Sequence, residues 1–86
     1  MNFLLVLPGN SLKNKEWGEA CVEHYSSWFD KVHMQYYDHW QDGSSETNIE
    51  AELEKLKNIT LPEDVNLFVF AKSIGSLLAL VAIQKI

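Results

Sequence analysis

The chain contains no arginine, and twelve acidic residues outnumber its seven lysines, so the 86 residues carry a net charge of −5. Proteins that bind nucleic acids usually present a basic patch to the phosphate backbone, and this charge balance argues against DNA or RNA as a partner. Only one cysteine is present, Cys21, which excludes an intramolecular disulfide. Because Cys21 lies in a helical pattern, we expect a small buried side chain in a reducing compartment and predict a cytoplasmic protein.

Long apolar runs are also missing. The amino-terminal run covers only residues 3–7 before Pro8-Gly9, which is too short for the core of a signal peptide or for a membrane span. We therefore expect no membrane association. The sequence does have 47% hydrophobic and only 22% charged residues, which is typical of a globular α/β protein. At this length we expect a single domain over residues 1–86.

Three stretches predict β-strands, at about residues 3–7, 32–37 and 66–70. The first and third are continuous apolar runs, the form of a parallel strand buried on both faces, whereas the second alternates and is rich in aromatic residues. Helical patterns separate them, and alternating strands and helices predict a parallel sheet with right-handed crossovers. The expected fold is a three-layer α/β/α arrangement with the short sheet ordered second–first–third, and with one helix on one face and two on the other.

The helices are expected from their apolar spacing and their caps. The first begins near Asn14 as its cap, presents an aromatic face that extends through Trp28 to Phe29, and ends at Asp30-Lys31. Residues 38–45 form a turn-rich loop, and Thr47 with Glu50 has the spacing of a capping box for the second helix. The last helix follows Ser73 and has almost no polar face, so it should be covered nearly all round. The charged residues predicted to form the solvated side of the second helix are Glu50, Glu52, Glu54, Lys55 and Lys57.

The segment Ala71-Lys72-Ser73-Ile74-Gly75 joins the third strand to the last helix. A small-x-Ser-x-small pattern at such a junction is typical of a nucleophile elbow, in which a sharp turn lifts the serine hydroxyl above the sheet. A serine nucleophile needs a base to take its proton, and the tetrahedral intermediate needs hydrogen-bond donors for its oxyanion. We interpret Ser73 as the candidate nucleophile and the backbone N–H of Ile74 as one oxyanion donor.

The expected strand order reverses the direction of winding at the first strand, so a crevice should open above the carboxyl ends of the strands. The loop after the first strand borders this crevice together with Ser73. A second oxyanion N–H is expected from that loop, at Asn10 or Ser11. Further candidates for lining the crevice are Gly9, Asp38, His39 and Lys72.

Structural roles compete with several of these assignments. The first strand separates His39 and Asp38 from Ser73 at about 5 Å per strand spacing, so a loop or packing role is the alternative for both. Lys72 either lowers a nearby pKa or extends toward solvent or a neighbouring loop. His24 lies on the aromatic helix face and His33 within a strand, and both favour structural roles.

No metal or cofactor is expected. Asp38, His39 and Asp42 are too few and too loosely constrained for a metal site. The loop after the first strand lacks the Gly-Lys-Ser/Thr of a P-loop, and the serine turn lacks the paired glycines of a dinucleotide fingerprint. A flavodoxin-like binder that holds phosphate in the first loop is a weaker alternative.

Three motifs together resemble the amino-terminal half of a small bacterial member of the α/β-hydrolase superfamily. They are Leu7-Pro8-Gly9-Asn10, Tyr37-Asp38-His39-Trp40 and Ala71-Lys72-Ser73-Ile74-Gly75-Ser76, with alanine at the first small position where the family usually has glycine. The resemblance implies a partial α/β-hydrolase fold with Ser73 as nucleophile and the amides of Ile74 and of Asn10 or Ser11 as oxyanion hole. It also places the triad acid and histidine beyond Ile86, so we expect this chain to be the amino-terminal portion of a longer domain.

The expected function is therefore a serine hydrolase that cleaves an ester, thioester or amide of a small-molecule substrate through an acyl-Ser73 intermediate. Residues 1–86 alone should be inactive because they lack a positioned base. The alternative is a noncatalytic protein-interaction module that keeps the hydrolase fold. In either case the edge of the third strand and the last helix are the surfaces through which a homo-oligomer would form.

Overall fold

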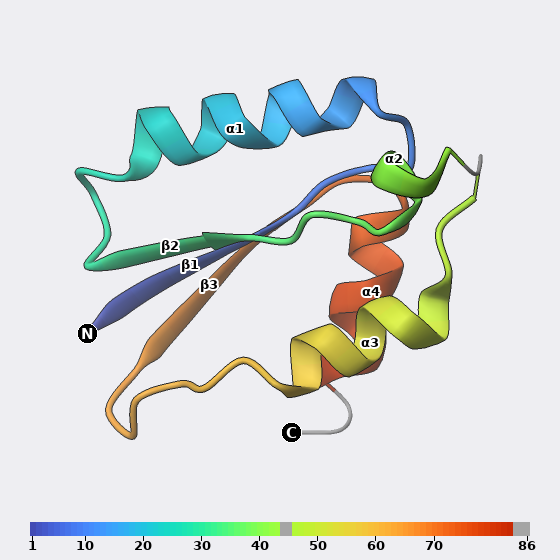
Figure 1. Ribbon diagram of the computed structural model, residues 1–86. Coiled ribbons are helices and arrows are strands. Elements are labelled where there is room, and N and C mark those ends of the chain that lie inside the picture. The colour runs from blue at the N-terminus through green and yellow to red at the C-terminus, as the bar shows by residue number, and fades with distance from the viewer. Residues whose placement is uncertain (44–45, 84–86) are drawn as a thin grey trace.

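The computed structural model describes residues 1–43 and 46–83 and shows a three-stranded parallel sheet with helices on both faces (Figure 1). The strand order is β2-β1-β3, as the sequence predicts. In chain order the elements are β1 (Asn2–Leu7), α1 (Lys13–Tyr25), β2 (Lys31–Met34), α2 (His39–Asp42), α3 (Ile49–Lys57), β3 (Asn66–Ala71) and α4 (Ile74–Ile83).

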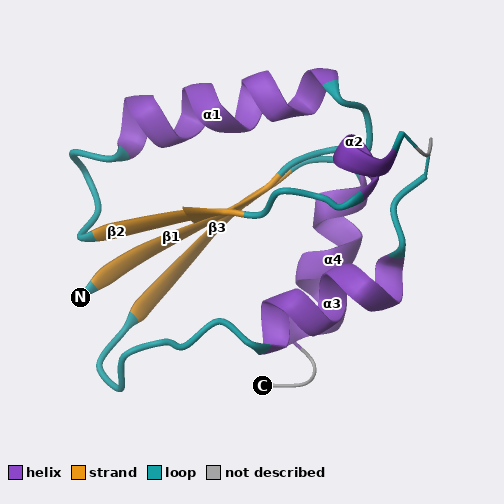
Figure 2. Ribbon diagram, viewed as in Figure 1, coloured by secondary structure: helices purple, strands orange, loops and turns teal. Residues whose placement is uncertain are grey.

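The central strand β1 supplies both halves of the core. Its residues Leu4 and Val6 are fully buried and pack with Met34 against α1, where Cys21 is partly buried as part of the same cluster. Leu7 faces the other way and packs with residues of α3 and α4. Figure 2 shows α1 alone on one side of the sheet and α3 and α4 on the other, which confirms the predicted layers.

The register of the sheet brings the ends of β1 and β3 to the same level. All six residues of β1 pair with β3, from Asn2 opposite Asn66 to Leu7 opposite Ala71. One further hydrogen bond, from the Lys72 N–H to the Leu7 carbonyl at 3.0 Å, continues the ladder past the last pair. The loop after β1 and the turn after β3 therefore start side by side.

The second strand is shorter than the predicted 32–37 and ends at Met34. The Gln35 N–H still donates to the Val6 carbonyl at 3.0 Å. Beyond that point the side chains are drawn into contacts outside the sheet, because the Gln35 amide donates to Glu52 and the Tyr37 hydroxyl to the Pro8 carbonyl. The short helix α2 then occupies part of what the sequence predicts as a loop.

Glu52 is fully buried, so its assignment to a solvated surface is wrong. One carboxylate oxygen accepts from Gln35 Nε2 at 3.0 Å and lies 3.1 Å from Lys55 Nζ, and the other accepts from the Asp38 N–H at 3.0 Å. A buried carboxylate is tolerated when it is paired and hydrogen-bonded in this way. Glu52 therefore ties α3 to the segment that follows β2.

The helix caps also differ from the prediction. Asn48, not Thr47, caps α3, since its Oδ1 accepts from the Ala51 N–H at 3.1 Å. Asn14 lies inside α1, whose first turn instead uses the Ser11 hydroxyl as an acceptor at 3.2 Å. For α3, Thr47 and Asn48 are both able to cap, so local sequence does not decide between them, whereas the N-cap of α1 is Leu12, which makes no side-chain cap hydrogen bond.

The first helix ends at Tyr25 rather than continuing through Trp28, which is largely exposed. The chain leaves the helix here because Asp30 is bound to the start of β1. Its carboxylate accepts from the Asn2 N–H at 2.6 Å, and its N–H donates to the Asn2 carbonyl at 2.8 Å. This contact directs the chain into β2.

Apolar side chains remain exposed on one side of the described fold. On α4, Leu77 and Leu80 are 47% and 62% exposed, so this helix is not covered all round as predicted. Leu67 and Phe68 are exposed on the edge strand β3. Among the described helices, none has the length and apolar character needed to cross a membrane.

Candidate functional site

The turn between β3 and α4 holds Ser73 in an unusual backbone conformation. Ser73 has φ of 56°, in the left-handed region, and it is the one non-glycine residue with positive φ in the described part of the chain. Two hydrogen bonds close the turn: the Gly75 N–H donates to the Lys72 carbonyl and the Ser76 N–H to the Ser73 carbonyl, both at 2.9 Å. Non-glycine residues in this region cluster at functional sites because the surrounding structure must enforce them.

Gly75 allows the turn to sit directly on the end of β1. A Cβ atom at this position would lie 2.0 Å from the Leu7 carbonyl oxygen and 2.8 Å from that of Pro8. Only a residue without a side chain fits such an approach to another backbone segment. This close approach explains why Gly75, the second small residue of the predicted pattern, has no side chain.

Ser73 itself is exposed, and α4 begins at the next residue. The first N–H groups of a helix have no intrahelical acceptor, and the helix dipole favours negative charge at this end. The backbone N–H of Ile74 is the first of these groups. The turn therefore presents a hydroxyl and a donor environment suited to a developing anion.

Lys72 lies over the indole ring of Trp17 on α1, with Nζ 5.4 Å from the ring centroid. Such a cation–π contact directs the ammonium group toward α1. Burial raises the pKa of the nearby Cys21 thiol, and the positive charge of Lys72 partly opposes that rise. The contact of Lys72 is with a helix, and its two predicted roles, a lowered nearby pKa or an extension toward solvent or a neighbouring loop, stay predictions.

The loop after β1 is held in place by residues that follow β2. The Tyr37 hydroxyl donates to the Pro8 carbonyl, and burial, with a contribution from Glu52, raises the pKa of Tyr37 above its usual range. Gly9, a predicted lining residue, belongs to this loop and is buried. The loop is therefore fixed rather than free to fold over the serine.

Asn10 is the centre of these contacts. Its carbonyl accepts from His39 Nε2 at 2.6 Å and from Trp40 Nε1 at 3.0 Å. Its side-chain Oδ1 accepts from the N–H of Thr47 at 2.9 Å and also from the Thr47 hydroxyl. The sequence identifies Asn10 but assigns no role to Trp40 or Thr47 at this site; the aromatic motif that follows the second strand is the signal that could have pointed to Trp40.

His39 is 6% exposed and its ring is committed to this loop. Because a carbonyl can only accept, Nε2 carries the proton, and the other ring nitrogen, Nδ1, is buried with no partner among the described residues. Asp38 points elsewhere and pairs with Lys55 at 2.9 Å. In residues 1–43 and 46–83, neither side chain forms a hydrogen bond with Ser73.

The remaining histidines lie away from the turn. His24 packs against the ring of Tyr25, and His33 is half-buried in β2, where burial and the charge of Lys31 lower its pKa. Both positions agree with the structural roles predicted for them. Within the described residues no group of three His, Cys, Asp or Glu side chains could hold a metal ion.

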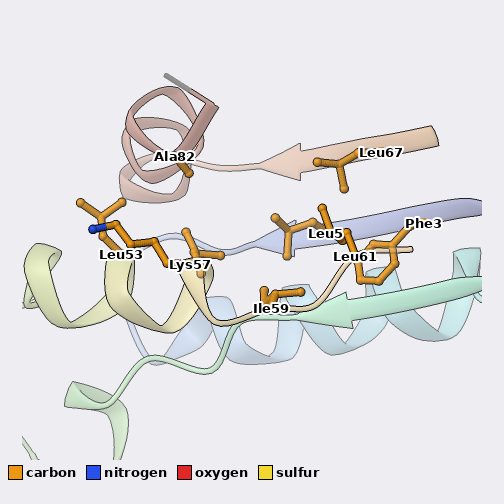
Figure 3. Close-up of a pocket in the computed structure, with 9 residues that line it drawn as sticks. Phe3, Leu5, Leu53, Lys57, Ile59, Leu61, Leu67 and Ala82 are labelled. Atoms are coloured by element: carbon orange, nitrogen blue, oxygen red, sulfur yellow. The ribbon is translucent and has the colours of Figure 1, made fainter. Parts of the chain in front are cut away.

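An apolar pocket of about 280 Å³ lies on the opposite face from α1 (Figure 3). It opens near the amino ends of β1 and β3, where Phe3 pairs with Leu67, and so lies far along the strands from Ser73. Lys57 is its one charged lining residue. The lining residues are Phe3, Leu5, Leu53, Leu56, Lys57, Ile59, Leu61, Leu67 and Ala82.

The candidate site thus has two parts. One is Ser73, with its strained backbone, at the carboxyl edge of the parallel sheet. The other is the neighbouring loop, in which Asn10 accepts hydrogen bonds from His39, Trp40 and Thr47. Comparison of the chain with protein-family models, with curated proteins and with solved structures found no match.

Proposed function

We propose that the protein is a serine hydrolase of the α/β-hydrolase type that cleaves an ester, thioester or amide of a small molecule. The observation that carries the proposal is the left-handed backbone of Ser73 directly after the parallel edge strand β3. This conformation is the strained strand-to-helix turn that an exposed serine nucleophile requires. Gly75, packed on the Leu7 carbonyl, holds the turn against β1.

In the proposed reaction the Ser73 hydroxyl oxygen attacks the substrate carbonyl carbon and loses its proton to a base. The resulting oxyanion is bound by the N–H of Ile74 and by an N–H of the Asn10-Ser11 loop. Collapse of the intermediate expels the alcohol, thiol or amine and leaves an acyl-Ser73 ester, which water then hydrolyses. Since the His39 ring is bound to Asn10, we do not assign the base to His39.

Labelling by a fluorophosphonate probe tests this proposal on the full-length protein. We expect the probe to modify Ser73, and Ser73→Ala to abolish the modification, as read by intact mass and peptide mapping. The matched control is Ser76→Ala, which removes another exposed serine from the same helix start and should leave labelling unchanged. An unlabelled native protein, or labelling that survives Ser73→Ala, would refute the proposal.

The proposed reaction requires no cofactor. A cytoplasmic location is part of the proposal, and it is supported by the single unpaired thiol of Cys21.

Exposed apolar side chains favour a second candidate function, in which the fold acts as an interaction module. Leu77 and Leu80 on α4, with Leu67 and Phe68 on β3, present apolar surface that water-exposed monomers normally limit. We expect such a module to self-associate through this edge, and sedimentation velocity over a range of concentrations measures it. A compact monomer at the highest concentration would remove this candidate.

A further inference from the structure

The peptide group between Asn10 and Ser11 is oriented by two donors from one side. His39 Nε2, at 2.6 Å, and Trp40 Nε1, at 3.0 Å, both donate to the Asn10 carbonyl oxygen. A carbonyl oxygen has two lone pairs, so this acceptor is saturated. Both donors belong to α2, which follows β2, and the carbonyl is therefore drawn toward the β2 side of the loop.

The opposite end of the same peptide group must point the other way. In a planar trans peptide the carbonyl of one residue and the N–H of the next are antiparallel, and no cis peptide occurs in the described chain. The Ser11 N–H is therefore directed away from His39 and Trp40. The turn that carries Ser73 follows β3 at the same level of the sheet as this loop.

The Ser11 N–H is also available. In the described part of the chain no acceptor is hydrogen-bonded to it, although the Ser11 hydroxyl and carbonyl both take part in starting α1. Thr47 meanwhile anchors the Asn10 side chain through its N–H, at 2.9 Å, and its hydroxyl. The Asn10 and Ser11 carbonyls thus have partners, and the Ser11 N–H is left as a donor.

Burying the His39 ring is energetically unfavourable, and this supports a role for His39 in holding the Asn10 carbonyl. Its Nδ1 is buried without a partner among the described residues, and buried polar atoms in native structures are normally hydrogen-bonded. An apolar ring would fill the space without that cost. What an apolar ring would lose is the Nε2 donor to Asn10.

We infer that His39 and Trp40 are positioning residues, which fix the Asn10-Ser11 peptide so that the Ser11 N–H, rather than that of Asn10, serves as the second oxyanion donor beside Ile74. The inference rests on the proposed function of Ser73. In this inference His39 is neither a base nor a metal ligand. Its ring holds the peptide group that carries the backbone donor.

The test compares variants of the full-length protein with p-nitrophenyl acetate as substrate and a fluorophosphonate as probe. Trp40→Phe keeps an aromatic ring and removes the Nε1 donor, and His39→Leu removes the Nε2 donor. We expect each to lower kcat about tenfold with little change in KM, because an oxyanion exists only in the transition state and loss of a whole donor lowers kcat about 100-fold or more. His39→Gln, which keeps a side-chain N–H, should recover most of the loss.

Trp28→Phe is the matched control, since this exposed indole lies at the end of the fold remote from Ser73 and its loss should leave kcat unchanged. Native kcat in both Trp40→Phe and His39→Leu, or a loss confined to KM, would overturn the inference while leaving Ser73 as nucleophile. Failure of the native protein to be labelled at Ser73 would overturn the proposed function and this inference with it.

Discussion

Replacing Gly75 by alanine is expected to lower the free energy of unfolding by about 3 kcal/mol, at the upper end of typical overpacking costs. The added Cβ would lie 2.0 Å from the Leu7 carbonyl oxygen and 2.6 Å from its carbonyl carbon. Both atoms belong to the backbone of the central strand, so no side-chain rotation can relieve the clash. Urea denaturation followed by tryptophan fluorescence measures the loss.

Gly43→Ala is the matched control for this prediction. Gly43 has φ of 81°, but a methyl group added there would meet no atom within 4 Å, so alanine should cost only the conformational penalty of about 1–2 kcal/mol. A Gly75→Ala protein as stable as the native one would contradict the close packing of the serine turn on β1.

Replacing Glu52 by alanine should destabilise the protein by about 3 kcal/mol. The substitution removes the acceptor of the Asp38 N–H and one of the two acceptors of Gln35 Nε2, which keeps the Glu52 backbone carbonyl at 3.2 Å, and an unsatisfied buried donor costs about 1–3 kcal/mol. It also leaves Lys55 without its partner on the same helix. Because these contacts fix the segment after β2, the variant should lose stability without any change at Ser73.

Glu54→Ala provides the comparison for Glu52→Ala, because it makes the same substitution on the same helix at an exposed position. Glu54 pairs only with Lys57, at 3.2 Å, and exposed pairs contribute about 0–1 kcal/mol. Thermal and urea unfolding of the two variants side by side measure the difference. Equal losses in both would mean that the buried network around Glu52 does not stabilise the fold.

The strand order and the serine turn could be predicted from sequence because each depends on local pattern. Residues 3–7 and 66–70 are apolar almost throughout, as parallel strands often are, and Ser73 with Gly75 marks a strand-to-helix turn. The prediction that the third strand is buried on both faces is wrong, because β3 lies at the edge of the sheet and none of its residues is fully buried.

What sequence could not reveal depends on partners distant along the chain. Glu52 has the polar character of a surface residue, and its buried position depends on Gln35 and Asp38, which lie 17 and 14 residues away. The hydroxyl of Thr47 is suited to cap a helix, but it donates instead to the side chain of Asn10, 37 residues away. From the sequence His39 is a candidate for lining the crevice, but its ring is hydrogen-bonded to the Asn10 carbonyl, 29 residues away.

The left-handed backbone at Ser73 has a consequence for how the chain balances stability against activity. A side chain in this conformation costs about 1–2 kcal/mol that glycine would avoid. A sequence selected for folding alone would therefore carry glycine at position 73. Under the proposed function, the nucleophilic hydroxyl is what the protein gains in return for this strain, which is a sizeable cost for a small domain.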